Sequence, residues 1–178
     1  MGKILALAGS VGLTGAAVLA ATAAMKSGAG AVVLAVPKTV YPLIGKRCTE
    51  VMVKPVSDSS EGTFSNASLD SLRDELDWAD VILVGPGVGM HNDVHRFMES
   101  LLKLKNKRFL IDADGLNHIA ADKALLRDLK RNTCILTPHP GEFSRLSGHR
   151  GPEIEKKRMI LAKKYAKNVG VCLVLKGS

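Results

Sequence analysis

A histidine between two prolines is the residue of this sequence best placed for chemistry. His139 lies in the segment Thr137–Glu142, between Pro138 and Pro140, directly after an apolar, strand-like run at 134–136. Proline fixes its own φ and keeps the preceding residue extended, so the backbone on both sides of the histidine is rigid. The imidazole could serve as a neutral hydrogen-bonding group or as a general acid or base.

Carboxylates in two turns could bind a metal ion. Asp112 and Asp114 flank one alanine after a strand-like run. Two nearby carboxylates suit Mg²⁺, which prefers hard oxygen ligands and keeps several waters. Glu142 could help to hold the hydration shell of the ion, or it could only favour the helix dipole. Asp114 could instead cap the next helix, and Asn117 could contact a ligand or stabilise the turn.

Two glycine-rich turns, Gly9–Gly15 and Gly85–Gly89, also follow strand-like runs. Neither has the spacing of a Walker motif or of the dinucleotide-binding fingerprint. Their glycines either let a ligand approach the backbone or only permit a tight turn on the sheet. Because turns after parallel strands lie along one edge of a sheet, we expect both to converge with the segments Asp112–Asn117 and Thr137–Glu142.

Strand-like and helix-like runs alternate along the whole chain, which predicts a mostly parallel sheet covered by helices on both faces. Strands are expected at Lys3–Ala8, Ala31–Val36, Glu50–Lys54, Asp80–Val84, Arg108–Ile111, 134–136 and Gly170–Leu175. Helices are expected at Thr14–Ser27, Thr39–Gly45, around Leu69, Leu72 and Leu76, and at His91–Lys105, Ala121–Arg131 and Ile154–Asn168.

Size and composition favour one α/β domain over residues 1–178 that binds small anions. The net charge of +8 suits nucleotides, whereas the scarcity of aromatic residues disfavours a nucleic-acid partner. Cys48, Cys134 and Cys172 have no metal-binding or redox spacing, so we expect reduced thiols in the core.

The N-terminal run from Ile4 to Met25 carries no charge and resembles a signal peptide. The turn-forming Gly9–Gly15 segment interrupts it, whereas an exported or membrane-spanning segment would be more continuously apolar. We therefore expect a cytoplasmic protein without a membrane partner.

Taken together, the motifs resemble those of the ADP/ATP-dependent NAD(P)H-hydrate dehydratases, a family of the ribokinase-like superfamily. In chain order they are Ala8–Ser10 with Thr14–Ala20, Ser27–Gly30, Val84–Gly89, Asp112–Asn117, Thr137–Glu142 and Leu175–Gly177. The match spans essentially the whole chain. It implies a ribokinase-like fold of three layers, α/β/α, around a mostly parallel sheet.

The resemblance also implies a lyase that repairs NADH or NADPH whose nicotinamide ring has been hydrated. ADP or ATP, with Mg²⁺, would phosphorylate the added hydroxyl, and loss of phosphate would restore the ring. The substrate-binding residues would be Ala16, Gly87, Gly89 and His139. The nucleotide-binding residues would be Lys176, Gly177 and Ser178, and the weaker metal and phosphate assignments are Asp112, Asp114, Asn117 and Glu142.

One departure from the family pattern concerns the C-terminal end. Family members continue past the Lys-Gly motif into a glycine-rich loop with the presumed catalytic aspartate, whereas this sequence stops at Ser178. We therefore expect a domain incomplete at this end, little turnover by the chain alone, and an open sheet edge that favours a homo-oligomer. The alternatives are a ribokinase-like kinase of a vitamin precursor and a non-catalytic nucleotide-binding copy.

Overall fold

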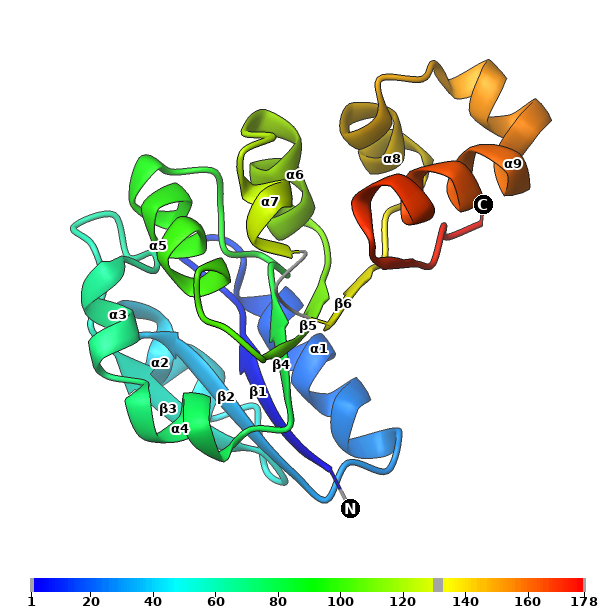
Figure 1. The fold of residues 1–178 in the computed structure, drawn as a ribbon. Coiled ribbons are helices and arrows are strands. Elements are labelled where there is room, and N and C mark those ends of the chain that lie inside the picture. Colours follow the sequence, from blue (N-terminus) through cyan, green and yellow to red (C-terminus); the bar gives the residue numbers. More distant parts are fainter. Residues whose placement is uncertain (1, 130–132, 178) are drawn as a thin grey trace.

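The computed structural model describes residues 2–129 and 133–177, and in them seven strands form one parallel sheet (Figure 1). The strand order is β3-β2-β1-β4-β5-β6-β7, and every neighbouring pair is parallel. The strands are β1 (Lys3–Leu7), β2 (Ala31–Pro37), β3 (Met52–Val56), β4 (Val81–Val84), β5 (Arg108–Ile111), β6 (Thr133–Leu136) and β7 (Cys172–Leu173). The expected parallel α/β architecture is confirmed.

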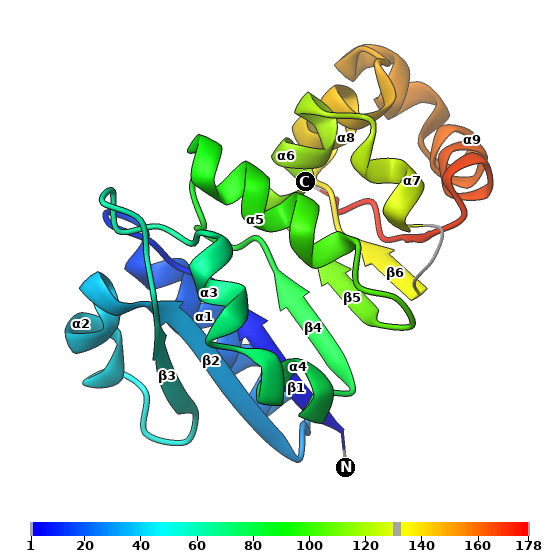
Figure 2. The same cartoon turned by 60° about the vertical axis from the view of Figure 1, so that its left-hand side comes forward.

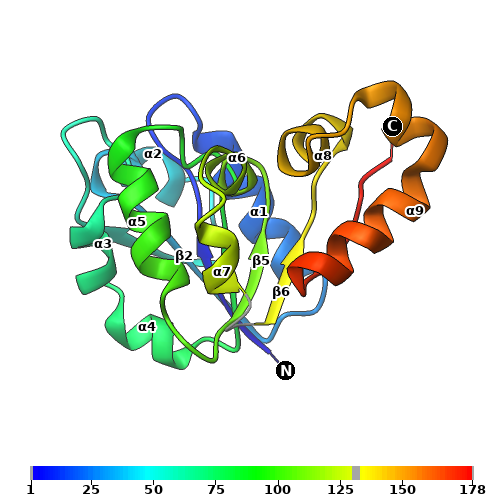
Figure 3. The ribbon, with the colours of Figure 1, turned by 45° about the horizontal axis from the view of Figure 1, so that its top comes forward.

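Helices connect successive strands of this sheet. They are α1 (Thr14–Lys26), the 3₁₀ helix η1 (Lys38–Val40), α2 (Tyr41–Gly45), α3 (Asn66–Asp70), α4 (Arg73–Trp78), α5 (Asn92–Leu102), α6 (Asp114–Ala121), α7 (Leu125–Leu129), α8 (Pro140–Ser147) and α9 (Gly151–Val169). In Figure 2, α3, α4, α5 and α7 lie in front of the sheet and α1 lies behind it. Helices α8 and α9 lie beyond β6 at one end of the molecule (Figure 3).

The main core lies between the sheet and the layer that contains α5. This helix buries Val94, Phe97, Met98 and Leu101, an i, i+3, i+4, i+7 pattern that makes one apolar stripe. The strands supply alternate residues such as Phe109 and the other inward-facing side chains of β1, β2 and β4 to β6. A second, smaller cluster joins α1 and α2 to β1 and β2 on the opposite face.

Tertiary contacts shift several elements away from their expected bounds. The segment after β5, which the sequence analysis treats as a turn, begins helix α6 at Asp114, where Gly115 packs closely against Gly85. The expected helix Ala121–Arg131 is only α7, and Arg131 lies outside the described residues.

Two further elements are shorter than the sequence predicts. The helix around Leu69, Leu72 and Leu76 is broken into α3 and α4, because Leu72 has a non-helical ψ of 7°. The last strand, expected at Gly170–Leu175, is only β7, because its regular pairing is limited to the residues opposite Ile135 and Leu136.

The three cysteines are free thiols, but they are not all in the core. Cys134 is buried, and this burial raises the pKa of its thiol to about 12. Cys48 is half-buried, and Cys172 is exposed, so the expectation of a core thiol is wrong for Cys172. Among the residues that the structure describes, its strand is the last one at that edge of the sheet. Within residues 2–129 and 133–177, none of the helices combines the length and the apolar character needed to cross a bilayer.

Candidate functional site

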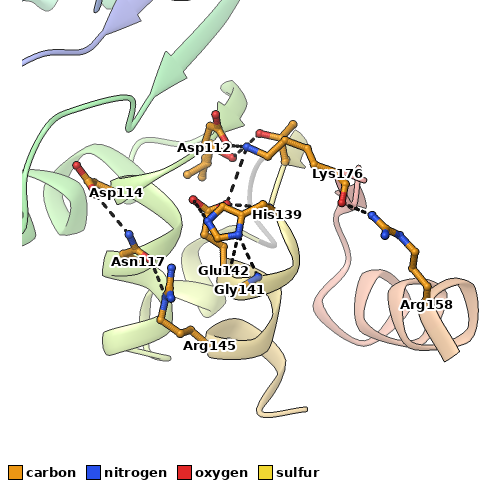
Figure 4. A network of polar contacts seen from close by, with 11 residues as sticks. Asp112, Asp114, Asn117, His139, Gly141, Glu142, Arg145, Arg158 and Lys176 are labelled. Carbon is orange, nitrogen blue, oxygen red and sulfur yellow. Dashed lines mark hydrogen bonds and ion pairs between the residues drawn. The ribbon is translucent and has the colours of Figure 1, made fainter. Parts of the chain in front are cut away.

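Polar side chains from three neighbouring strands meet at the carboxyl edge of the sheet (Figure 4). Asp112 follows β5, His139 follows β6 and Lys176 follows β7. The chain after β7 stays beside the segment after β6, because the Lys176 amide donates to the Pro138 carbonyl at 2.8 Å. Residues distant in sequence are thus brought together because their strands are neighbours in the sheet.

The Lys176 ammonium bridges two carboxylates. Its Nζ lies 2.7 Å from Asp112 Oδ1 and 3.9 Å from Glu142 Oε2. The side chains of Lys176 and Asp112 are 40% and 28% exposed, whereas that of Glu142 is only 6% exposed. A partly exposed pair of this kind contributes about 1 kcal/mol or less to stability. The arrangement therefore matters more for the charge it places at the site than for the stability of the fold.

His139 and Glu142 form a reciprocal cap at the start of α8. The Gly141 and Glu142 amides donate to His139 Nδ1 at 3.0 and 3.4 Å, and the His139 amide donates to Glu142 Oε2 at 2.8 Å. Because Nδ1 accepts these bonds, the neutral ring carries its proton on Nε2, which lies 3.4 Å from Glu142 Oε1. The ring is thus fixed in direction while half of the side chain remains exposed.

Two arginines that the sequence analysis did not single out hold this cluster in place. Arg158 of α9 donates to the Leu175 carbonyl at 2.9 Å and also to the Lys176 carbonyl, which fixes the segment after β7. Arg145 of α8 donates to Asn117 Oδ1 at 3.0 Å and so joins α8 to α6. Nothing in their sequence positions signals either role, because both roles depend on how separate elements pack.

The glycine turn after β4 packs tightly against the turn after β1. Gly87 has a φ of +67°, and a Cβ there would lie 2.8 Å from the Leu13 carbonyl oxygen and 3.0 Å from the Ala16 Cβ. The Gly87 carbonyl also accepts a hydrogen bond from Ser10 Oγ at 2.8 Å. Gly85 is equally constrained, because a Cβ would overlap the Asp112 carbonyl oxygen. The packing therefore accounts for the glycines at both positions.

Helix α6 holds Gly89 by both of its peptide groups. The Gly89 amide donates to Asp114 Oδ2 at 3.0 Å, and the Gly89 carbonyl lies 2.9 Å from His118 Nε2. Burial lowers the pKa of His118, which is 2% exposed, so its neutral form is favoured and Nε2 donates to the carbonyl. The sequence analysis missed His118, because a single histidine in a helix gives no functional signal.

The predicted site residues thus fall into two groups that α6 connects. Ala16, Gly87 and Gly89 are in one, and His139 is with Asp112, Glu142 and Lys176 in the other. Asp114 and Asn117 lie in α6 between them and contact each other at 3.4 Å. Gly177 is exposed at the end of the described chain, and Ser178 lies outside the described residues. A cavity of about 530 Å³ includes Pro86 and Asp112 in its lining, but neither Gly87 nor His139.

The carboxylates of this cluster fit a Mg²⁺ site only if a bound nucleotide supplies further ligands. Among the residues that the structure describes, no three His, Cys, Asp or Glu side chains form a metal-binding group. Asp112 and Glu142 nevertheless share one cation, the Lys176 ammonium. Mg²⁺ bound to a nucleotide needs only one or two protein carboxylates, because phosphates and water supply its other ligands. Asp112 and Glu142 can provide these.

Known proteins resemble this chain in both sequence and fold. A family model described as NAD(P)H-hydrate dehydratase matches residues 4–178. The bifunctional NAD(P)H-hydrate repair enzyme Nnr of Moorella thermoacetica is 39% identical over 177 residues, which make up 99% of this chain and 33% of that protein. This chain thus spans about a third of the length of that curated relative.

Two solved structures superpose on nearly the whole chain. One is the ADP/ATP-dependent NAD(P)H-hydrate dehydratase from Bacillus subtilis, co-crystallised with ATP and Mg²⁺, with a TM-score of 0.72 and 30% identity. This chain covers 58% of it. The other is a ribokinase-like superfamily protein from Enterococcus faecalis, with a TM-score of 0.80 and 24% identity, of which this chain covers 57%. The match to the second structure establishes a ribokinase-like fold.

Proposed function

Because this chain belongs to the NAD(P)H-hydrate dehydratase family, we propose that it forms part of an enzyme that restores hydrated NADH or NADPH at the expense of ADP or ATP. The terminal phosphoryl group of ADP or ATP is transferred to the hydroxyl of the hydrated nicotinamide ring. The phosphoanhydride bond breaks, AMP or ADP leaves, and the hydroxyl proton is lost. The carbon–oxygen bond then breaks, phosphate leaves with the electron pair, and a proton leaves the neighbouring ring carbon. The ring double bond is thereby regenerated.

The observation that carries this proposal is the continuous chain of contacts along one edge of the sheet. A Cβ added at Gly87 would lie 3.0 Å from the Ala16 Cβ, so the two residues are close neighbours. The Gly89 amide donates to Asp114, which begins helix α6 two residues after Asp112. Asp112 in turn pairs with Lys176. The chain connects the glycine turn after β4 at one end to a charged cluster at the other, and a reaction between two nucleotides needs both of them held close together.

The hydrated dinucleotide is assigned to the turns near Ala16, Gly87 and Gly89, with His139 directed at the damaged ring. Gly89 is half-buried, and the absence of a side chain there lets a phosphate approach the backbone closely. The ring of His139 is held in a fixed position by its cap bonds to α8, and half of its side chain is exposed to a ligand. Holding the reacting hydroxyl in a fixed place lowers the entropic cost of phosphoryl transfer.

The phosphates of ADP or ATP are assigned to Lys176, Gly177 and Ser178. Lys176 supplies a positive charge, and Arg158 fixes the backbone that carries it. Asp112 and Glu142 would hold a magnesium ion, which would neutralise phosphate charge when bound. Asp114 and Asn117 support this region through the hydrogen bonds of α6. No residue of this chain is assigned as the base that removes the hydroxyl proton.

We propose that the protein acts in the cytoplasm. Its three free thiols support this compartment. We also propose an assembly of identical chains through the sheet edge at β7, where Cys172 and Val174 are exposed. Sedimentation of the purified chain tests the assembly.

An absorbance assay tests the reaction. Hydrated NADPH is incubated with ADP or ATP and Mg²⁺, and the return of dihydronicotinamide absorbance is followed. Melting of the chain is measured in parallel with hydrated NADPH, because a ligand that binds the folded state at about 100 times its Kd stabilises it by about 2.7 kcal/mol. A gain in absorbance, or a melting shift with hydrated NADPH, supports the proposal.

A kinase of a vitamin precursor would consume ATP with pyridoxal and leave the hydrate unchanged. That result would contradict the proposal, as would the absence of both a melting shift and an absorbance gain.

A further inference from the structure

The Lys176 ammonium lies beside both carboxylates to which the proposed function assigns the magnesium ion (Figure 4). Its Nζ is 2.7 Å from Asp112 Oδ1 and 3.9 Å from Glu142 Oε2. Two cations that share the same oxygens repel each other, and the repulsion is strong where water is partly excluded. Lys176 and a magnesium ion therefore compete for these two carboxylates.

The side chain of Lys176 can leave the carboxylates without any change in the backbone. The Lys176 amide donates to the Pro138 carbonyl at 2.8 Å, and the Lys176 carbonyl accepts a hydrogen bond from Arg158. The ammonium, in contrast, is carried by a flexible four-carbon stem, and the side chain is 40% exposed. It can therefore turn from the carboxylates to a phosphate at the same edge of the sheet.

Glu142 opposes the departure of the ammonium unless another cation replaces it. The side chain of Glu142 is 6% exposed, and the bond from the His139 amide to Oε2 fixes its carboxylate at the start of α8. Within the described part of the chain, Lys176 carries the only ammonium or guanidinium group paired with Glu142. A buried carboxylate that loses its cation is strongly destabilised. Release of Lys176 and arrival of a new cation are thus linked.

We propose that Lys176 is a specificity-determining residue that excludes Mg²⁺ alone and admits it together with the nucleotide. For Mg²⁺ alone, the ammonium would have to give up both carboxylates with no other anion to pair with. When a nucleotide is present, the ammonium passes from the carboxylates to a phosphate. Lys176 has this role only if the cluster binds metal and nucleotide, as the proposed function assigns, but the chemistry at the hydrated ring does not enter.

Binding of Mg²⁺ alone to the Lys176→Met variant tests this role. Methionine keeps an unbranched side chain but has no charge, so the carboxylates lose their competing cation. In isothermal titration calorimetry at fixed ionic strength, the variant should bind Mg²⁺ about tenfold or more tightly than the wild type does. The double variant Lys176→Met with Asp112→Asn should lose this gain, which would place the metal at the cluster.

Two further variants separate the charge of Lys176 from other effects of its replacement. Lys176→Arg retains a positive charge, so it should bind Mg²⁺ as weakly as the wild type does. Lys103→Met is the matched control, because Lys103 also pairs with a carboxylate at 2.7 Å, that of Glu99, but on α5. Its affinity for Mg²⁺ should equal that of the wild type. Melting curves without ligand establish that each variant is folded.

Melting with Mg²⁺, with ATP and with both tests the part played by the nucleotide. In the wild type, the joint shift should exceed the sum of the separate shifts. In Lys176→Met the excess should shrink, because Mg²⁺ no longer needs a phosphate to take up the ammonium.

Equal Mg²⁺ affinities for the wild type and Lys176→Met would overturn the inference. So would tighter binding that survives Asp112→Asn, the same gain in Lys103→Met, or a wild type without an excess shift. Hydrated NADPH is absent from every measurement, so failure of the dehydratase reaction would leave these results unaffected.

Discussion

Lys176 and Asp112 are 64 residues apart in sequence, yet the lysine Nζ lies 2.7 Å from Asp112 Oδ1. The contact exists because β7 lies next to β6 and β6 next to β5, which places the ends of the three strands side by side. Glu142 lies 3.9 Å from the same ammonium. The Lys176 ammonium thus lies beside both of the carboxylates to which we assign the magnesium ion.

Replacing Gly87 by alanine should weaken both folding and dinucleotide binding. The new Cβ would clash with Leu13 and Ala16, and the φ of +67° is unfavourable for alanine, so we expect a loss of about 2–4 kcal/mol in the free energy of unfolding. Gly12→Ala is the matched control, because Gly12 has a φ of +81° but nothing within 4 Å of its Cβ position. Denaturant titration compares the two, and an equal loss in both would show that the Ala16 contact is unimportant.

Ala113→Gly should stabilise the protein. Ala113, between Asp112 and Asp114, has a φ of 51° and a ψ of −121°, a conformation that glycine adopts far more easily. We expect a gain of about 1 kcal/mol in the free energy of unfolding. Ala121→Gly, at the other end of α6, should instead lose stability, because glycine disfavours helix. Urea titration distinguishes these outcomes, and a loss in Ala113→Gly would refute the proposed backbone strain.

Stability should fall on acidification partly through His118. Burial lowers its pKa below the ordinary value of 6.5, despite the opposing bond to Gly89, so the unfolded chain takes up the proton first. The contribution of neutral His118 to the free energy of unfolding is fully present above pH 6.5. It is lost as the pH falls from there toward the folded-state pKa. The groups that face the ring are His95, whose ring centroid is 5.6 Å away, and Asp114.

The measurement is melting temperature against pH for the wild type and for His118→Gln. Glutamine can still donate to the Gly89 carbonyl but does not titrate. The wild type should therefore lose more stability than the variant below pH 6.5. Parallel curves for the two proteins would mean that His118 does not contribute to the loss of stability at low pH. His91→Gln is the control, since His91 is exposed.

Tyr165→Phe should not destabilise the protein. The Tyr165 hydroxyl is buried and has no hydrogen-bond partner among the described residues, and burial raises its pKa to about 12. Its ring packs edge-on against Phe143 at 5.5 Å, a contact that phenylalanine retains. Removing an unsatisfied buried hydroxyl should gain up to about 1–2 kcal/mol. A loss greater than about 1 kcal/mol in denaturant titration would show that the hydroxyl has a partner.

The sequence predicted the layered α/β fold because strand and helix patterns alternate without interruption. It also placed the polar segments after strands correctly, since the edge of a parallel sheet follows from strand direction. It did not reveal α6, because Asp114 and Gly115 are typical turn residues and only packing on Gly85 makes them helical.

The contacts within the site were less predictable than their location. The pairing of Lys176 with Asp112 depends on strand order, which local patterns do not determine. The bond between His118 and Gly89 depends on the direction of a helix that the sequence did not reveal. The backbone at His139 is extended, as the flanking prolines predict, but its role as the cap of α8 depends on a ring nitrogen, and proline spacing cannot specify that.

Asp112→Asn, assayed by melting with ATP and Mg²⁺, is the most direct test of the proposed site. Asp70→Asn is the control, because Asp70 pairs with Arg73 in an exposed position. If Asp112 helps to hold the metal–nucleotide complex, the wild type and Asp70→Asn should be stabilised equally. Asp112→Asn should be stabilised by about 1.4 kcal/mol less, the equivalent of a tenfold weaker affinity. An equal shift in all three proteins, or no shift in any, would contradict the assignment of this cluster to nucleotide binding.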